Sequence, residues 1–137
     1  MSGLSEPFHI LFVDDDQIAL ELAERALGNE RYCITCASTG EEALRLLDVL
    51  DVDVVVVDLV MPSMDGVELL HRIKCCDAVS HIPAIAVSGR ADEIAIANAL
   101  SAGAIRFISK PFHWETFATE IRKALTPDPV VTVCSGP

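Results

Sequence analysis

Several residues that can bind a metal ion or a phosphoryl group follow short, mostly apolar segments of the sequence. Asp14 and Asp15 follow FHILFV, and Asp58 follows VVVV. Ser88 comes after IPAIAV, and Lys110 comes after IRFIS. Carboxylates that lie close together raise one another's pKa values unless a cation lies among them. Oxygen ligands at a partly open site suit a hard divalent ion such as Mg²⁺, which keeps several waters beside one or two carboxylates.

These residues meet only if the segments before them are neighbouring strands of one sheet. Segments of apolar residues alternate with stretches whose apolar residues recur at helical spacing. Five such strand–helix units in one short chain predict a doubly wound parallel α/β fold with helices on both faces of the sheet. Ligands bind such sheets at the carboxyl ends of the strands, where the residues named above would lie. We expect strands at residues 8–13, 32–37, 53–57, 82–87 and 105–108, and helices at 16–28, 39–50, after 65, from 92 to about 103, and 114–125.

Each acid also has a simpler interpretation. Asp58 by itself can be a nucleophile, a metal ligand, a helix cap or a solvated side chain. Acids at two neighbouring strand ends are common by chance, but the hydroxyl of Ser88 and the ammonium of Lys110 at the next two strand ends make chance a poor explanation. Asp16 and Asp65 precede predicted helices, and capping explains both better than metal binding does.

The composition limits the class of protein. The chain has 137 residues, which suits one domain, and we expect a tail at 1–7, a folded domain at 8–125 and a tail or the start of a linker at 126–137. Its net charge of −11 argues against a nucleic-acid backbone or an anionic membrane as the direct partner. Because no apolar stretch approaches the length of a membrane span and no signal peptide is recognisable, we expect a cytoplasmic location.

The cysteines and histidines form no recognisable metal or redox motif. Cys33 and Cys36 make a CxxC spacing, but it falls within a predicted strand rather than at a helix start, and no second pair completes a zinc set. We therefore expect the five cysteines to be small buried or half-buried thiols. The scattered histidines predict surface or packing roles. They are His9, His71, His81 and His113.

Five stretches together resemble one family, the response-regulator receiver domain of two-component signalling, in its chemotaxis-receiver-like form. The stretches cover residues 10 to about 125 in the order and spacing of the family. They are ILFVDD at 10–15, VDLVMPSMDG at 57–66, AVSG at 86–89, ALSAGA at 99–104 and FISKP at 107–111. The resemblance implies a flavodoxin-like three-layer sandwich whose parallel strands lie in the order 2-1-3-4-5.

The resemblance also implies the centre of the site. Asp58 matches the aspartate that attacks a phosphohistidine on a partner protein and becomes an acyl phosphate. Asp14 and Asp15 match the acidic pair that, with Asp58, holds Mg²⁺, with Mn²⁺ as the alternative ion. The backbone carbonyl of Val60 matches a further protein ligand of the metal.

Four other residues match positions that stabilise the phosphoryl group or respond to it. Lys110 matches the lysine that pairs first with the aspartate and then with its phosphoryl group. Ser88 matches the residue whose hydroxyl turns to a phosphoryl oxygen, and Phe107 matches the aromatic residue whose rotamer follows that turn. The Lys110-Pro111 bond matches a peptide bond that is usually cis in the family.

The function implied is that of a signalling phosphoacceptor that assists its own phosphorylation and dephosphorylation, rather than an enzyme. Its partners would be a histidine kinase or phosphotransfer protein and a downstream protein or fused output domain. The signal would emerge on the surface formed by the helix after Asp92, the strand at 105–108 and the last helix. A homodimer through this same surface is possible. For Ile94, Ile96 and Leu100 on that surface, core packing is the favoured explanation of most.

Two questions stay open at this point. The chain can be a stand-alone receiver or a receiver fragment of a longer regulator whose output domain is absent. A remote alternative is a HAD-like phosphatase, but such an enzyme normally has a second aspartate where this chain has Val60. The sequence also lacks the Walker glycine motif of a P-loop enzyme and the glycine motif of a Rossmann domain. Val60 and Arg90 lie two residues beyond Asp58 and Ser88, flanking the expected path of an attacking water, and we hypothesise that they tune the lifetime of the phosphoryl group.

Overall fold

The computed structural model describes residues 7–29, 31–61 and 64–125. The predicted tails at 1–6 and 126–137, with Cys134, lie outside these residues. One five-stranded parallel sheet forms the middle of the fold, with its strands in the order β2-β1-β3-β4-β5. This confirms the predicted fold class and strand order. The strands are β1 (Phe8–Val13), β2 (Tyr32–Ala37), β3 (Val54–Asp58), β4 (Ala84–Ser88) and β5 (Arg106–Ser109).

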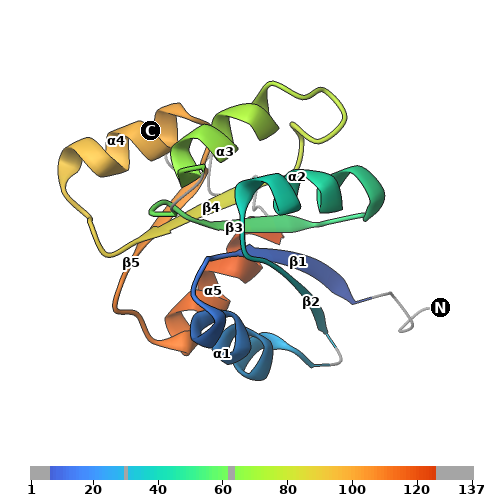
Figure 1. Ribbon diagram of the computed structural model, residues 1–137. Helices are drawn as coiled ribbons and strands as arrows, with labels where there is room; N and C mark the ends of the chain where they lie inside the picture. The colour runs from blue at the N-terminus through green and yellow to red at the C-terminus, as the bar shows by residue number, and fades with distance from the viewer. Residues whose placement is uncertain (1–6, 30, 62–63, 126–137) are drawn as a thin grey trace, which may run out of the picture.

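Helices cover both faces of the sheet, as Figure 1 shows, with α1 and α5 below it and the other three helices above. Four of the helices begin with an aspartate or threonine whose side chain accepts a backbone N–H of the first turn, which confirms Asp16 and Asp65 as caps. The helices are α1 (Gln17–Leu27), α2 (Gly40–Val49), α3 (Gly66–Lys74), α4 (Glu93–Ser101) and α5 (Trp114–Leu125).

Alternate residues of the central strands fill two separate cores. In β3, Val55 and Val57 pack with α2 and α3, while Val54 and Val56 pack with α1 and α5. All four valines are fully buried, and burying a side chain of this size contributes about 1.5–3 kcal/mol. The solid apolar strand therefore provides a rigid support for the residue at its carboxyl end, which is Asp58.

Burial differs from the sequence-based expectation in three places. In α1 the helical spacing of apolar residues predicts Leu22 on the same face as Ala23 and Leu27, but Leu22 is exposed and Leu20 packs inward in its place. In α4 the preference for core packing is wrong for Ile94 and Leu100, which are 73% and 47% exposed.

The third difference concerns the cysteines. Cys36 is half-buried as expected, but Cys33, Cys75 and Cys76 are exposed. Cys33 lies on β2, an edge strand that pairs with β1 alone, so one side of it has no neighbouring strand to cover it.

Within the described residues, no helix combines the length and the apolar character that a bilayer crossing requires.

Candidate functional site

The site lies at the carboxyl edge of the sheet, where the strand register brings distant residues together. Asp58, the last residue of β3, pairs with Val87 of β4, and Ser88 is the next residue along. Ser88 in turn pairs with Ser109 of β5, and the N–H of Lys110 donates to the carbonyl oxygen of Ser88 at 2.9 Å. Asp14 follows β1, which lies on the other side of β3. The expectation that these strand ends converge is confirmed.

Three carboxylates form a cluster at the centre of this edge. Ligand oxygens of Asp14, Asp15 and Asp58 lie within 4.8 Å of one another. Asp14 and Asp58 are 1% and 7% exposed, whereas Asp15 is open to solvent. Such a set, with hard oxygen donors and one open side, matches the chemistry that Mg²⁺ requires. Burial of two of the carboxylates without a cation would be costly.

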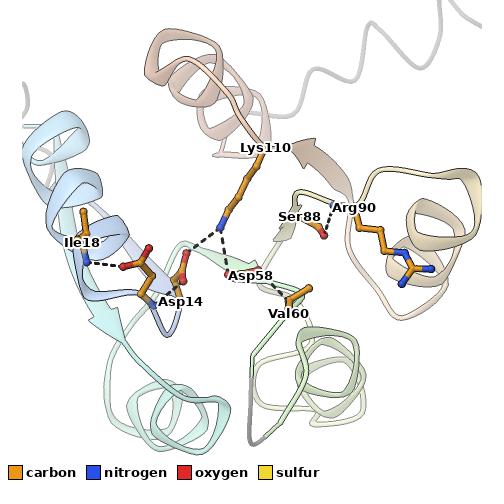
Figure 2. Close-up of polar contacts among 8 residues, drawn as sticks. Asp14, Ile18, Asp58, Val60, Ser88, Arg90 and Lys110 are labelled. Atoms are coloured by element: carbon orange, nitrogen blue, oxygen red, sulfur yellow. Dashed lines mark hydrogen bonds and ion pairs between the residues drawn. The ribbon is translucent and has the colours of Figure 1, made fainter.

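Lys110 supplies one positive charge to this cluster. Its Nζ lies 3.4 Å from Oδ2 of Asp14 and 3.3 Å from Oδ2 of Asp58. In Figure 2 its side chain reaches down from the end of β5 between the two acids. The Lys110 side chain is 35% exposed, so solvent screens these pairs in part. The arrangement places a cation where negative charge would develop on a group attached to Asp58.

The protonation equilibria reflect this crowding. Burial raises the pKa of Asp14, and the negative charge of Asp58 adds to the rise, while the backbone N–H of Asp16 and the charge of Lys110 oppose it. Burial lowers the pKa of Lys110, but the carboxylates of Asp58 and Asp14 outweigh that effect and leave it raised. Lys110 is therefore a firmly protonated cation, and the ionised form of Asp14 is disfavoured mainly by its burial.

Backbone donors fix the orientation of both buried carboxylates. Oδ1 of Asp58 accepts the N–H of Val60 at 3.0 Å, and Oδ1 of Asp14 accepts the N–H of Asp16 at 2.9 Å. Each acid thus presents its second oxygen, Oδ2, to Lys110. The turn after Asp58 is closed by the N–H of Gly66, which donates to the carbonyl oxygen of Leu59 at 3.0 Å.

Ser88 and Arg90 form the side of the site toward α4. The Ser88 side chain is buried, and its Oγ accepts the N–H of Arg90 at 3.0 Å. The Arg90 guanidinium pairs with Asp92 at 3.2 Å and, as Figure 2 shows, points away from Asp58. Ser88, Arg90 and Val60 all line one cavity of about 270 Å³. Val60 and Arg90 therefore border the same cavity, and their effect on the lifetime of the phosphoryl group stays a hypothesis.

Two further predicted features can be located. Phe107 is half-buried on β5, opposite Ala86, and packs against the core on the α2–α4 side of the sheet. The Lys110-Pro111 peptide bond is cis, as expected. Sequence reasoning did not identify the N–H of Val60 as a donor to Asp58, because backbone donors leave no side-chain signal. The Val60 side chain itself is 67% exposed.

Comparisons with known proteins agree with this arrangement. The family model described as the response regulator receiver domain matches residues 10–122. The transcriptional regulatory protein CseB of Streptomyces avermitilis is 33% identical over 89% of this chain and 51% of its own length. The regulatory protein VirG of Agrobacterium tumefaciens is 38% identical over 90% of this chain and 45% of its own length.

A solved structure extends the likeness to three dimensions. It is the crystal structure of a CheY-like response regulator receiver domain protein from Methanospirillum hungatei JF-1, which is 28% identical with a TM-score of 0.81. The match covers 88% of this chain and 94% of that one. By contrast, this chain spans only about half the length of the curated relatives it matches.

Proposed function

Because this chain belongs to the family of response regulator receiver domains of two-component systems, we propose that Asp58 is its phosphoacceptor. The observation that carries this assignment is the position of Asp58 at the end of the central strand β3, between the ends of β1 and β4, with Nζ of Lys110 3.3 Å from its Oδ2. Capping does not explain Asp58, since it ends a strand, whereas Asp65 caps α3. The phosphoryl donor would be a phosphohistidine on a histidine kinase or phosphotransfer protein.

In the proposed reaction an oxygen of Asp58 attacks the phosphorus of the phosphohistidine. A P–O bond forms, the P–N bond breaks, and its electron pair returns to the imidazole of the donor. The N–H of Val60 holds the carboxylate in place, and the ammonium of Lys110 lies where it can neutralise a phosphoryl oxygen. Positioning and charge stabilisation of this kind supply most of the catalysis in phosphoryl transfer.

The acidic cluster fits a divalent cation. Asp14, Asp15, Asp58 and the backbone carbonyl of Val60 would hold Mg²⁺, with Mn²⁺ as the alternative. The donors are hard oxygens that lie within 4.8 Å of one another, and Asp15 leaves one side of the cluster open to solvent. When bound, the ion supplies charge that balances the phosphoryl oxygens.

Phosphorylation would be read out through Ser88 and the elements beyond it. A phosphoryl group adds about −1.5 to −2 charges and strong acceptor oxygens, toward which the Ser88 hydroxyl can turn. Phe107 would then change rotamer, and the two states would differ on the surface formed by α4, β5 and α5. Exposed Ile94, Leu100 and Ile105 on α4 and before β5 provide apolar area there for a downstream protein or a second copy of the chain.

The whole protein's output is a separate question. The chain spans about half the length of its transcriptional regulatory relatives, and this favours the alternative in which the receiver is part of a longer regulator with an output domain. We therefore propose that the chain is the receiver part of a longer regulator and not a stand-alone receiver. The domain limits 8–125, the cytoplasmic location, the lack of direct nucleic-acid contact and the non-enzymatic role stay predictions.

Intact mass spectrometry tests the phosphoacceptor. The protein is incubated with Mg²⁺ and acetyl phosphate, and one phosphoryl adduct is expected in the wild type and none in Asp58→Asn. Asp65→Asn is the matched control, because asparagine caps a helix as well as aspartate does and the adduct should persist. An adduct retained in Asp58→Asn, or none formed in the wild type with any phosphodonor or kinase, would overturn the proposal.

A further inference from the structure

A histidine and a cysteine meet on the surface at the far end of α3 from the candidate site. His71 lies in the last turn of this helix, and Cys75 is its C-cap. Residues four apart lie on the same side of a helix, one turn above the other. The Nε2 atom of His71 and the Sγ atom of Cys75 are 3.7 Å apart, and both residues are exposed. Neither side chain takes part in the proposed phosphoryl transfer.

The distance between these atoms suits two ligands of one tetrahedral metal ion. Zinc binds cysteine sulfur at about 2.3 Å and histidine nitrogen at about 2.0–2.1 Å, which with a tetrahedral angle places the two ligand atoms about 3.6 Å apart. The observed separation is 3.7 Å. Little side-chain movement is therefore needed to bind an ion. The backbone is also fixed here, because the N–H of Cys75 donates to the carbonyl oxygen of His71 at 3.0 Å.

One nearby positive charge is balanced, and the end of the helix itself attracts cations. Arg72 lies between the two ligands in sequence, but its guanidinium is paired with Glu68 at 2.7 Å. The stem of Lys74 packs beside Gly103 at the end of α4. Carbonyl groups at the C-terminal end of a helix carry partial negative charge and attract cations. The chain as a whole carries a net charge of −11.

This pair is separate from the acidic cluster. Gly66 begins α3 beside the turn after Asp58, and a helix of nine residues spans about 13 Å. In the part of the chain that the structure describes, the one group of three or more close metal-ligand side chains is the cluster of Asp14, Asp15 and Asp58. The pair on α3 thus offers two protein ligands and leaves the remaining positions of an ion to water.

We propose that His71 and Cys75 form a surface binding site for Zn²⁺ at the C-terminal end of α3. The imidazole donates the lone pair of Nε2, and the Cys75 thiol loses its proton to the buffer on binding, with no change of oxidation state. Zinc is favoured over Mg²⁺ because thiolate and imidazole are softer ligands than carboxylate. The neighbouring exposed thiol, Cys76, has no contact with the His71 ring among the described interactions and serves as the matched control.

Cobalt(II) substitution tests this site without interference from the acidic cluster, since a thiolate ligand gives Co²⁺ a charge-transfer absorption in the near ultraviolet that carboxylates do not. The reduced full chain is titrated with Co²⁺ in excess Mg²⁺, and Zn²⁺ is then added to displace it. The band should appear in the wild type and in Cys76→Ser, and should be absent in Cys75→Ser.

In His71→Gln the apparent affinity for Zn²⁺, measured by competition with a chromophoric chelator, should fall about tenfold or more, since even loss of a group that only supports a metal ligand costs about 10–100-fold. Far-ultraviolet circular dichroism checks that each variant is folded. Absence of a thiolate band in the wild type would overturn the proposal. So would equal loss of the band in Cys75→Ser and Cys76→Ser, or an unchanged affinity in His71→Gln.

Discussion

Gly66, the first residue of α3, lies close against the backbone of Asp58 and Leu59. A methyl group at this position should therefore disturb both the stability of the fold and the site. A Cβ atom on Gly66 would lie 2.5 Å from the carbonyl oxygen of Asp58 and 2.5 Å from the Cα atom of Leu59. Both contacts are with backbone, which cannot rotate away as a side chain can. The Gly66→Ala variant must therefore move the backbone of Asp58 and Leu59 or the start of α3.

The size of the effect follows from two opposing contributions. Overpacking that forces side chains or backbone to shift costs about 1–3 kcal/mol, and we place Gly66→Ala near the upper value because both crowded atoms are backbone. Replacing glycine by alanine in a helix gains at most about 1 kcal/mol, and less in the first turn. The net loss of folding free energy is about 2 kcal/mol, which for a chain of this size lowers the melting temperature by about 8 °C.

Thermal unfolding followed by circular dichroism measures this loss, and the adduct assay with acetyl phosphate measures the displacement of Asp58. Gly89→Ala is the control, because its Cβ would meet Lys110 only at 4.0 Å, an ordinary contact. That variant should match the wild type or gain up to about 1 kcal/mol from the lower entropy of its unfolded chain. Equal melting temperatures for Gly66→Ala and the wild type would refute the reasoning.

Three other predictions follow from the charges and exposures described above. With a chelator present at pH 7, Asp14→Asn should have a higher melting temperature than the wild type. The difference should shrink as the pH falls, because the wild-type carboxyl of Asp14 has a raised pKa and takes up its proton. A variant that melts at or below the wild type would contradict this prediction. Val60→Ala and Arg90→Ala should change the rate at which the phosphorylated protein loses its phosphoryl group, because both residues line the cavity beside Ser88; unchanged rates in both would end that hypothesis. Burial and the charges of two glutamates raise the pKa of Cys36 to about 11. A thiol reagent at neutral pH should therefore label the exposed Cys33 and should not label Cys36 until the protein unfolds. Equal labelling of the two cysteines in the native state would argue against this prediction.

The layout of the site could be predicted because it depends on strand ends. A run such as VVVV is typical of a strand buried on both faces of a covered parallel sheet, and the residue that follows it, Asp58, is then expected at the carboxyl edge. The same argument places Ser88 and Lys110 at that edge once the strand order is known. The hydrogen bond from the N–H of Val60 to Asp58 depends on the path of the turn and left no signal in the residue types.

Helix burial was harder to predict where apolar residues surround the whole helix. In α4 only Ala99 is buried, yet Ile94 and Leu100 are as apolar as core residues, so periodicity does not identify the inward face. The pair on α3 was missed for a related reason. His71 and Cys75 have the four-residue spacing of helical neighbours, but that spacing gains meaning only when the helix is known to continue to its C-cap at Cys75.

The most direct test of the central claim is to locate the phosphoryl group by residue. The protein is phosphorylated with acetyl phosphate and Mg²⁺, treated with borohydride, which reduces an aspartyl phosphate to homoserine, and mapped by peptide mass spectrometry. Our account predicts homoserine at position 58 alone, and its loss when a chelator replaces Mg²⁺. Homoserine at Asp14, Asp15 or any other aspartate, with position 58 unmodified, would contradict it.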